Sequence, residues 1–169
     1  PDNAAACVLG SVVVSAIDCS GRARAIRLEM PDGFGVAAVV PNYQLPTAQM
    51  RAVLPEGYSN RDAIFNLQRV ALLVAALSTG DRRAFPTALE DRLHQPYRAA
   101  VMPGLDEILA LRAPGLLGST LSGAGPSVLV FFEKGAGSCA ELVRQIFERR
   151  GLEAEILPAP VAPEGYRTS

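Results

Sequence analysis

The hydrophobic positions in the first quarter of the chain predict three β-strands. Val12–Ile17 is a nearly continuous apolar run, and apolar residues alternate with polar ones in Arg24–Met30. Turn-forming residues at 18–21 separate these two segments, so the pair is predicted to form a β-hairpin. Phe34–Val40 has the composition of a buried strand and should end before Pro41.

The strongest helical pattern follows in the middle of the chain. Ser59 and Asp62 have the spacing of a capping box, and the apolar run behind them continues to Leu77. Gly80 then stands where a C-terminal glycine is expected. Because apolar residues occupy nearly all sides of this predicted helix, we expect it to lie in the core.

Three shorter helices are predicted, one before this segment and two after it. Thr47 can cap a short helix that carries Arg51 and that a proline ends. Ala84–Arg92 and Leu105–Ala113 also have helical patterns, whereas the proline-containing segment 94–98 between them is predicted to interrupt the helix.

The last third of the chain predicts a β-α-β unit. Ser127–Phe132 is an apolar strand, and Ser138 with Glu141 forms a second capping-box pattern for a helix that continues to Arg150. Residues 152–156 then alternate as a strand with one wet face. Together these elements predict an α+β fold, a two-layer sandwich with a mostly antiparallel sheet and helices on one face.

Composition narrows the class of protein. The 169 residues are 49% hydrophobic, enough to bury the core of one domain, or of one domain and part of another. A formal net charge of −1 gives no reason to expect nucleic acid or an anionic membrane as a partner. The three cysteines are widely spaced, which argues against a disulfide framework or a zinc site and favours a cytoplasmic protein.

The start of the chain is unusual for a natural N-terminus. Pro1, Asp2 and Asn3 lead directly into an apolar segment, without a methionine. We interpret this start as an internal point of a longer protein. Taken alone, Asp2 and Asn3 are typical caps of a following helix.

Three further features could carry chemistry. The segment Leu121–Ser127 holds two glycines, and its N–H groups could surround an anion. It matches neither common nucleotide-binding glycine motif, however, and taken alone it is more typical of a tight turn before a buried strand. Arg51 and Arg98 could each bind a carboxylate or a phosphate through a guanidinium fork, although most arginines are simply solvated. His94, the only histidine, is more typical of a hydrogen-bonding residue than of a catalyst.

Taken together, the motifs resemble the GHMP kinase family and, within it, the homoserine kinases. Leu121–Ser127 resembles the third glycine motif of that family. Four further segments resemble homoserine kinases in particular: Leu93–Arg98 with Met102–Gly104, the "VP…T…R…LP" residues 40–55, Asp62–Leu67, and Pro1–Asn3 as the end of an "HPDN" element. The resemblance covers essentially the whole chain, in family order, and implies the C-terminal two thirds of such an enzyme.

The resemblance implies a function and a set of site residues. Such an enzyme transfers a phosphoryl group from ATP to the hydroxyl of L-homoserine, with Mg²⁺, as a homodimer. It implies a carboxylate clamp of Arg51 and Arg98, a substrate pocket that Asp2 and Asn3 also line, and Thr47 near the transfer site. A nucleotide-supporting loop would comprise Ser122, Gly123, Ala124 and Gly125. No side-chain base and no metal ligand are predicted in this chain.

The departures from the family matter equally. The family's phosphate-binding loop and its acidic Mg²⁺ ligand precede the "HPDN" element, and neither stands among these residues. We therefore expect residues 1–33 to be a remnant of the N-terminal kinase domain, residues 34–169 to be the C-terminal domain, and the chain alone to be inactive. Two alternatives stay open: a stand-alone amino-acid-binding or interaction module, and a GHMP kinase for another small alcohol.

Overall fold

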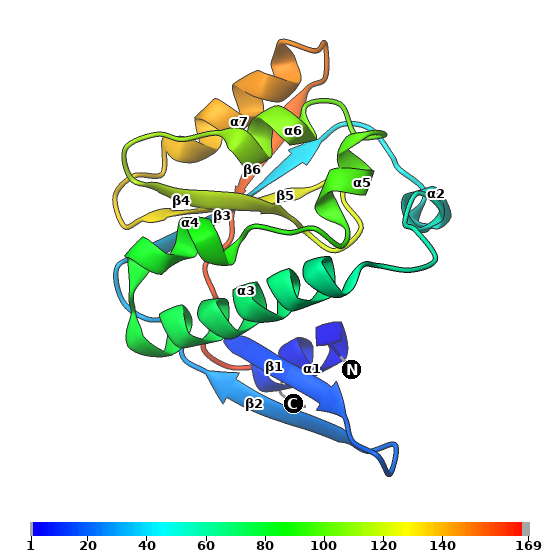
Figure 1. Ribbon diagram of the computed structural model, residues 1–169. Helices are drawn as coiled ribbons and strands as arrows, with labels where there is room; N and C mark the ends of the chain where they lie inside the picture. Colours follow the sequence, from blue (N-terminus) through cyan, green and yellow to red (C-terminus); the bar gives the residue numbers. More distant parts are fainter. Residues whose placement is uncertain (1, 167–169) are drawn as a thin grey trace.

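A four-stranded antiparallel sheet forms the centre of the computed structural model, which describes residues 2–166 (Figure 1). The strand order is β4-β5-β3-β6, and every neighbouring pair is antiparallel. The strands are β3 (Phe34–Pro41), β4 (Leu116–Leu121), β5 (Val128–Glu133) and β6 (Ala154–Pro158). The predicted α+β class with an antiparallel sheet is confirmed.

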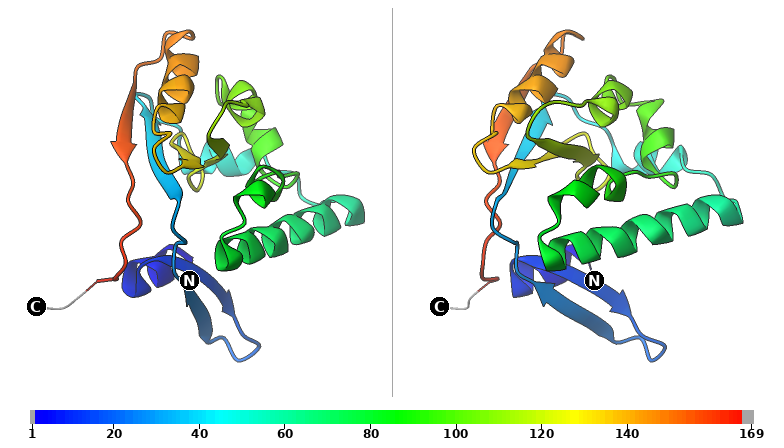
Figure 2. Two further views of the ribbon diagram at one scale, coloured as in Figure 1. Left: turned by 90° about the vertical axis from the view of Figure 1, so that its left-hand side faces the viewer. Right: turned by 60° about the vertical axis from the view of Figure 1, so that its left-hand side comes forward.

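Two helices cover one face of this sheet (Figure 2). They are α6 (Leu105–Ala110) and α7 (Cys139–Glu148). The main core lies between them and the sheet, where Val39 and Val130 meet Phe147, and all three side chains are fully buried. This is the two-layer packing that the sequence predicts, because alternate strand residues point to the same face.

A smaller core lies on the opposite face, near β4. The ring of Phe85, in α4 (Phe85–Ala88), packs against the rings of Phe34 and Phe131, with centroid separations of 4.8 and 5.6 Å. Ala76 and Leu77, at the end of α3 (Asn60–Thr79), complete this cluster. The second face of the sheet is therefore partly covered as well.

The N-terminal segment forms a separate, two-stranded sheet. Strands β1 (Val12–Ile17) and β2 (Ala23–Leu28) pair as the predicted hairpin, and α1 (Asp2–Leu9) lies beside it. The Asp18 carboxylate stabilises the turn. It accepts hydrogen bonds from the Ser20 hydroxyl, from backbone N–H groups and from Arg24, and these lower the pKa of Asp18 to about 2.

Helix α3 has the predicted ends but not the predicted burial. The Ser59 hydroxyl accepts a hydrogen bond from the Asp62 N–H, and Gly80 adopts the left-handed conformation, φ 72°, at the C-terminus. The expectation of a core helix is wrong in this structure, because only the C-terminal end of α3 reaches a core. Exposed fractions of 55%, 69% and 57% are found for Ile64, Leu67 and Val70.

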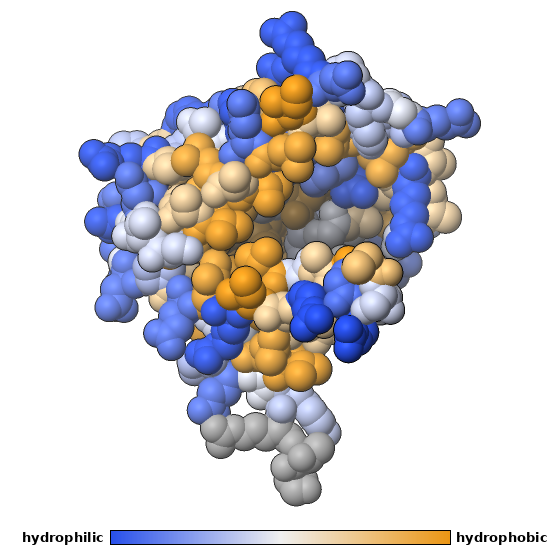
Figure 3. Space-filling model, turned by 60° about the horizontal axis from the view of Figure 1, so that its bottom comes forward, coloured by the Kyte–Doolittle hydropathy of each residue, from blue (hydrophilic) through white to orange (hydrophobic). Residues whose placement is uncertain are grey.

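These side chains contribute to a large apolar surface. Val14, Ile17 and Ile26 of the hairpin are also exposed. Figure 3 shows a band of hydrophobic residues across the face that carries α3 and the hairpin. By length and composition, α3 is the one helix in residues 2–166 that could cross a membrane, a property that core helices of water-soluble proteins share.

Several predicted helix boundaries are wrong, each for a local reason. Helix α2 (Thr47–Ala52) starts at Thr47, but Pro46 is its N-cap and Thr47 makes no capping hydrogen bond. The predicted helix 84–92 ends at Ala88, after a 3₁₀ turn at Arg82–Ala84. Helix α5 (Gln95–Ala99) occupies the segment predicted to be an interruption, because proline is favourable in the first turn of a helix.

Strand β4 is missing from the sequence prediction altogether. Its middle residues Gly118 and Ser119 are not strand formers, and a β-bulge near Gly118 breaks the alternation. The second capping box is also not formed, since Ser138 makes no side-chain cap and Glu141 pairs with Arg144 instead.

The two serines provide a matched test of the helix caps. Replacing Ser59 with alanine should lower the free energy of unfolding by about 1 kcal/mol, because a helix N–H loses its acceptor. The Ser138→Ala variant should stay within about 0.5 kcal/mol of the wild type. Urea denaturation measures both values, and equal losses would contradict this assignment of the caps.

Candidate functional site

Arg98 connects three segments that are far apart in the sequence. From α5, its Nη1 donates to the carbonyl oxygen of Gly123 at 2.9 Å, and its Nε donates to the carbonyl oxygen of Met50 at 3.4 Å. The side chain is half-buried. Helix α2, helix α5 and the glycine segment, which the sequence predicts to act together, therefore meet around one guanidinium.

Arg51 follows Met50 on α2, so the two predicted clamp residues lie on adjoining elements. Arg51 is exposed, and its guanidinium has no hydrogen-bond or ion-pair partner among residues 2–166. Thr47 is also exposed and lies four residues before Arg51, which places both on the same side of the helix. One guanidinium is thus fixed in position and the other is free to bind.

His94 orients Arg98. The distance from Nη1 of Arg98 to Nδ1 of His94 is 3.3 Å, and because a guanidinium only donates, Nδ1 must be the acceptor. The neutral ring then carries its hydrogen on Nε2, which lies 3.8 Å from a carboxylate oxygen of Asp91. Burial lowers the pKa of His94, and the positive charge of Arg98 lowers the pKa further. The negative charge of Asp91 acts in the opposite direction, but the net result is a pKa below the usual value of 6.5.

Asp91 fixes the start of α5. Its carboxylate accepts hydrogen bonds from the backbone N–H groups of Leu93, His94 and Gln95, at 3.2, 2.8 and 2.6 Å. Burial acts to raise the pKa of Asp91, but the N–H groups of Gln95 and His94 and the Asn66 amide outweigh it and hold the pKa below 3.8. A carboxylate that is charged at neutral pH therefore caps the helix that carries Arg98.

Gln95 ties α5 to the sheet. It is 3% exposed, and its Oε1 accepts hydrogen bonds from the Thr120 hydroxyl and from the Leu121 N–H, both at 3.0 Å. Thr120 directly precedes the glycine segment, and Leu121 is its first residue. Neither Asp91 nor Gln95 was predicted as a site residue from the sequence. The available indication was an aspartate four residues before the first residue of a proline-containing helix.

The glycine segment uses part of its backbone for its own turn. Gly123 and Gly125 have φ values of +59° and +86°, which glycine adopts without strain. The Ser122 N–H donates to Ser127 at 2.9 Å, and the Gly125 N–H donates to Ser122 at 3.0 Å. In the described part of the chain, this leaves the N–H groups of Gly123 and Ala124 without an acceptor.

The residues Asp2 and Asn3 lie elsewhere. Both belong to α1, beside the hairpin and on the far side of α3 from α5 (Figures 1 and 2). Asn3 is exposed, and the Asp2 side chain lies outside the described residues. The structure does not bring Asn3 next to Arg98, so the substrate role of these two residues stays a prediction.

The residues present do not fit a Mg²⁺ site. Among residues 2–166, no group of three or more histidine, cysteine, aspartate or glutamate side chains could hold a metal ion. Asp91 is linked to Arg98 through His94, but its carboxylate already accepts three backbone hydrogen bonds.

The pH dependence of stability tests the role of His94. Because the pKa of His94 is lower in the folded protein than its usual 6.5, the unfolded chain binds the proton first as the pH falls. The free energy of unfolding should decrease below about pH 6.5. His94→Asn should remove this part of the slope between about pH 7.5 and 5.5, since the chain has one histidine. Urea denaturation at several pH values measures the slope, and an unchanged slope in the variant would contradict the assignment.

Comparisons with known proteins support this arrangement of motifs. A family model described as "GHMP kinases C terminal" matches residues 73–147. The homoserine kinase of Solibacter usitatus is 60% identical over 166 residues, which cover 98% of this chain and 55% of that protein. The homoserine kinase of Deinococcus radiodurans is 38% identical over 169 residues, 98% of this chain and 54% of that protein.

Solved structures show the same fold. A homoserine kinase from Cytophaga hutchinsonii superposes with a TM-score of 0.85 at 24% identity, covering 95% of this chain and 51% of that one. A Lactococcus lactis galactokinase complexed with galactose gives a TM-score of 0.57 at 18% identity, covering 93% and 53%.

The chain spans about half the length of the curated relatives it matches, rather than the predicted two thirds. The matched family model describes a C-terminal domain, and named homoserine kinases align along almost all of this sequence. The chain therefore belongs to the GHMP kinase family, whose C-terminal domain it carries in the form found in homoserine kinases.

Proposed function

We propose that the parent protein of this chain is a homoserine kinase, which phosphorylates the hydroxyl of L-homoserine with ATP, and that this chain holds the substrate carboxylate. The observation that carries the proposal is the placement of Arg98, fixed by α2, α5 and the glycine segment, with Arg51 exposed beside it. The 60% identity to a named homoserine kinase supports the choice of substrate.

The proposed clamp works by positioning. Arg98 is oriented before any ligand binds, and its Nη2 has no partner in the described part of the chain, so one donor remains for a carboxylate oxygen. Arg51, whose guanidinium is unoccupied among the described residues, supplies a complete fork. Fixing the carboxylate at two points directs the substrate hydroxyl, and such positioning can supply up to roughly 7–11 kcal/mol of barrier reduction.

The other predicted site residues take supporting roles in this proposal. Thr47 shares the exposed side of α2 with Arg51 and would face the same substrate. Asp2 and Asn3 would line the pocket only if α1 lies closer to α5 in the complete enzyme than it does here.

ATP, when bound, supplies the phosphoryl group, and this chain contributes only part of its site. In the segment Ser122, Gly123, Ala124 and Gly125, the two free N–H groups would support the phosphates. The Mg²⁺ ligands are proposed to lie in a part of the parent protein before these residues, as is the phosphate-binding loop. We also propose that residues 1–33 belong to that N-terminal domain and 34–169 to the C-terminal one.

The two alternatives make different predictions. A stand-alone amino-acid-binding module would bind homoserine without turnover, even as the product of the complete gene. A GHMP kinase for another small alcohol would not need two guanidinium groups for a carboxylate. The likeness to a galactokinase and to the mevalonate kinase of L. major, at 18% and 14% identity, shows the fold alone.

The Arg98→Ala variant tests the clamp directly. Isothermal titration with L-homoserine should show at least about tenfold weaker binding, because a charged hydrogen bond is lost. Arg22→Ala, in the exposed hairpin, is the matched control and should bind as the wild type does. Equal heats for wild type and Arg98→Ala would remove the clamp assignment.

The activity of the chain by itself is a second test. The 169-residue polypeptide, which contains no serine- and glycine-rich phosphate loop, should show no homoserine-dependent ATP turnover. The product of the complete gene should show it. A coupled ADP assay compares the two, and turnover by the 169-residue polypeptide would overturn the interpretation as a part of the enzyme.

The proposed partners are L-homoserine, ATP and a second copy of the protein, in the cytoplasm, without nucleic acid or membrane. The apolar surface of Val8, Val14, Ile17 and α3 supports self-association, since a polypeptide that exposes such an area must cover it or lose solubility. Light scattering should give more than the mass of one chain, and a clean monomer would count against the homodimer.

A further inference from the structure

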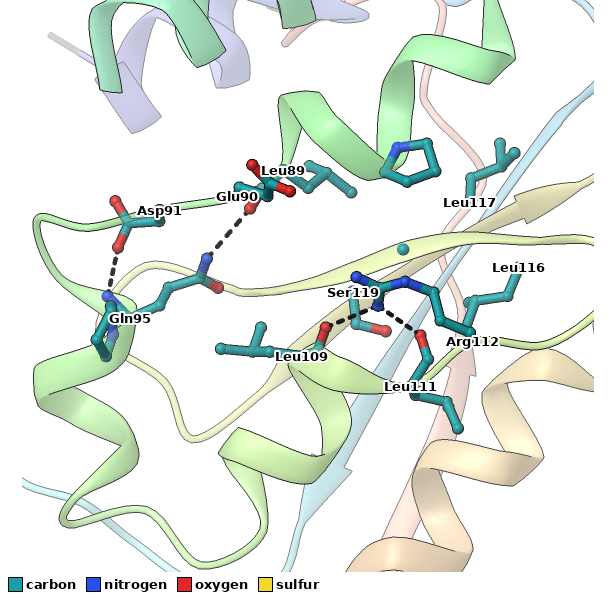
Figure 4. A pocket seen from close by; sticks show the side chains of 13 residues that line it. Leu89, Glu90, Asp91, Gln95, Leu109, Leu111, Arg112, Leu116, Leu117 and Ser119 are labelled. Carbon is teal, nitrogen blue, oxygen red and sulfur yellow. Dashed lines mark hydrogen bonds between the residues drawn. The ribbon is translucent and has the colours of Figure 1, made fainter. Parts of the chain in front are cut away.

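A cavity of about 210 Å³ lies at the outer edge of β4, apart from the clamp (Figure 4). Its walls come from α4, α6, the start of α5 and β4, and they are mostly leucine and proline, including Leu89, Leu109 and Leu116. An apolar cavity of about 150 Å³ can hold benzene, so this one has room for a ligand of about eight heavy atoms.

Ser119 is a buried polar group in this wall that no protein atom satisfies. The residue is 6% exposed, and its hydroxyl has no hydrogen-bond partner. Figure 4 shows its side chain in the centre of the lining, between Gln95 and Arg112. A buried hydroxyl without a partner costs stability, so an unmet donor at this point indicates a place where a ligand would supply the acceptor.

Some of the charged groups around the cavity already have partners, and one could still bind a ligand. The Asp91 carboxylate is occupied by backbone N–H groups, and Glu90 pairs with Arg69 of α3 at 2.8 Å. Arg112 has no carboxylate partner among residues 2–166. Its Nη1 donates to the carbonyl oxygens of Leu109 and Leu111, which orients the guanidinium, while Nε and Nη2 donate to nothing in the described part of the chain.

We propose that this cavity is a second small-molecule site, which binds a small aliphatic carboxylate. The alkyl part lies among the leucines, the carboxylate accepts from Arg112, and the Ser119 hydroxyl donates to the same group. A phosphate does not fit this chemistry, because it needs more donors than one guanidinium and one hydroxyl supply. The site lies apart from the proposed clamp, and its existence does not rest on the proposed kinase activity.

Gln95 connects this cavity to the clamp. It lines the cavity, and its side chain also accepts hydrogen bonds from Thr120 and from Leu121, at the start of the glycine segment. The helix that begins at Gln95 carries Arg98. A ligand in the cavity therefore contacts a residue that ties the helix of Arg98 to the glycine segment, which makes the site suited to an effector.

Titration with 4-methylpentanoate tests the proposal, using the product of the complete gene with Arg98→Ala so that the clamp does not bind the probe. Isothermal titration should give a dissociation constant on the order of 1 mM, and the uncharged 4-methylpentanamide should bind at least about tenfold more weakly. Arg112→Gln should remove this preference for the carboxylate, whereas Arg61→Gln, an exposed arginine of α3, should keep it.

Ser119→Val provides an independent variant, since it fills part of the cavity and removes the hydroxyl. Combined with Arg98→Ala, it should abolish binding of the probe. In the protein that keeps Arg98, Ser119→Val should leave homoserine binding intact, which also shows that the variant folds. Absence of probe binding, or binding that neither Arg112→Gln nor Ser119→Val weakens, would overturn the site.

Discussion

The carboxylate of Asp91 fixes the start of α5, and the placement of Arg98 depends on it. Three backbone N–H groups bind this carboxylate, so α5 begins at a defined point despite being only five residues long. One turn later, Arg98 reaches Met50 and Gly123. An isolated helix of this length would not be stable, so the buried acceptor and not helix propensity holds the proposed clamp together.

Apolar side chains are buried in one part of the molecule and exposed in another. The main core between the sheet and α6 and α7 is closed, with Val39, Val130 and Phe147 fully buried. In contrast, most of α3 turns apolar side chains outward, and the hairpin continues this surface. An exposed apolar surface of this kind is typical of an interaction site, which fits the self-association proposed above.

The sequence predicted those elements that depend on residues close together in the chain. The hairpin, β3, β5, the caps of α3 and the apolar side of α7 follow from alternation and capping residues. Strand β4 could not be predicted, because the bulge near Gly118 breaks its alternation and its pairing with β5 is a tertiary contact. The roles of Asp91 and Gln95 also depend on tertiary contacts, and so does the exposure of α3, whose apolar pattern alone indicated a core helix.

A crystal structure of the complete gene product with bound L-homoserine would show whether Arg51 and Arg98 hold the carboxylate of the substrate. We expect carboxylate oxygens within hydrogen-bond distance of both guanidinium groups, with Arg98 still bound to Met50 and Gly123. A homoserine molecule whose carboxylate lies away from both arginines would contradict the proposed clamp.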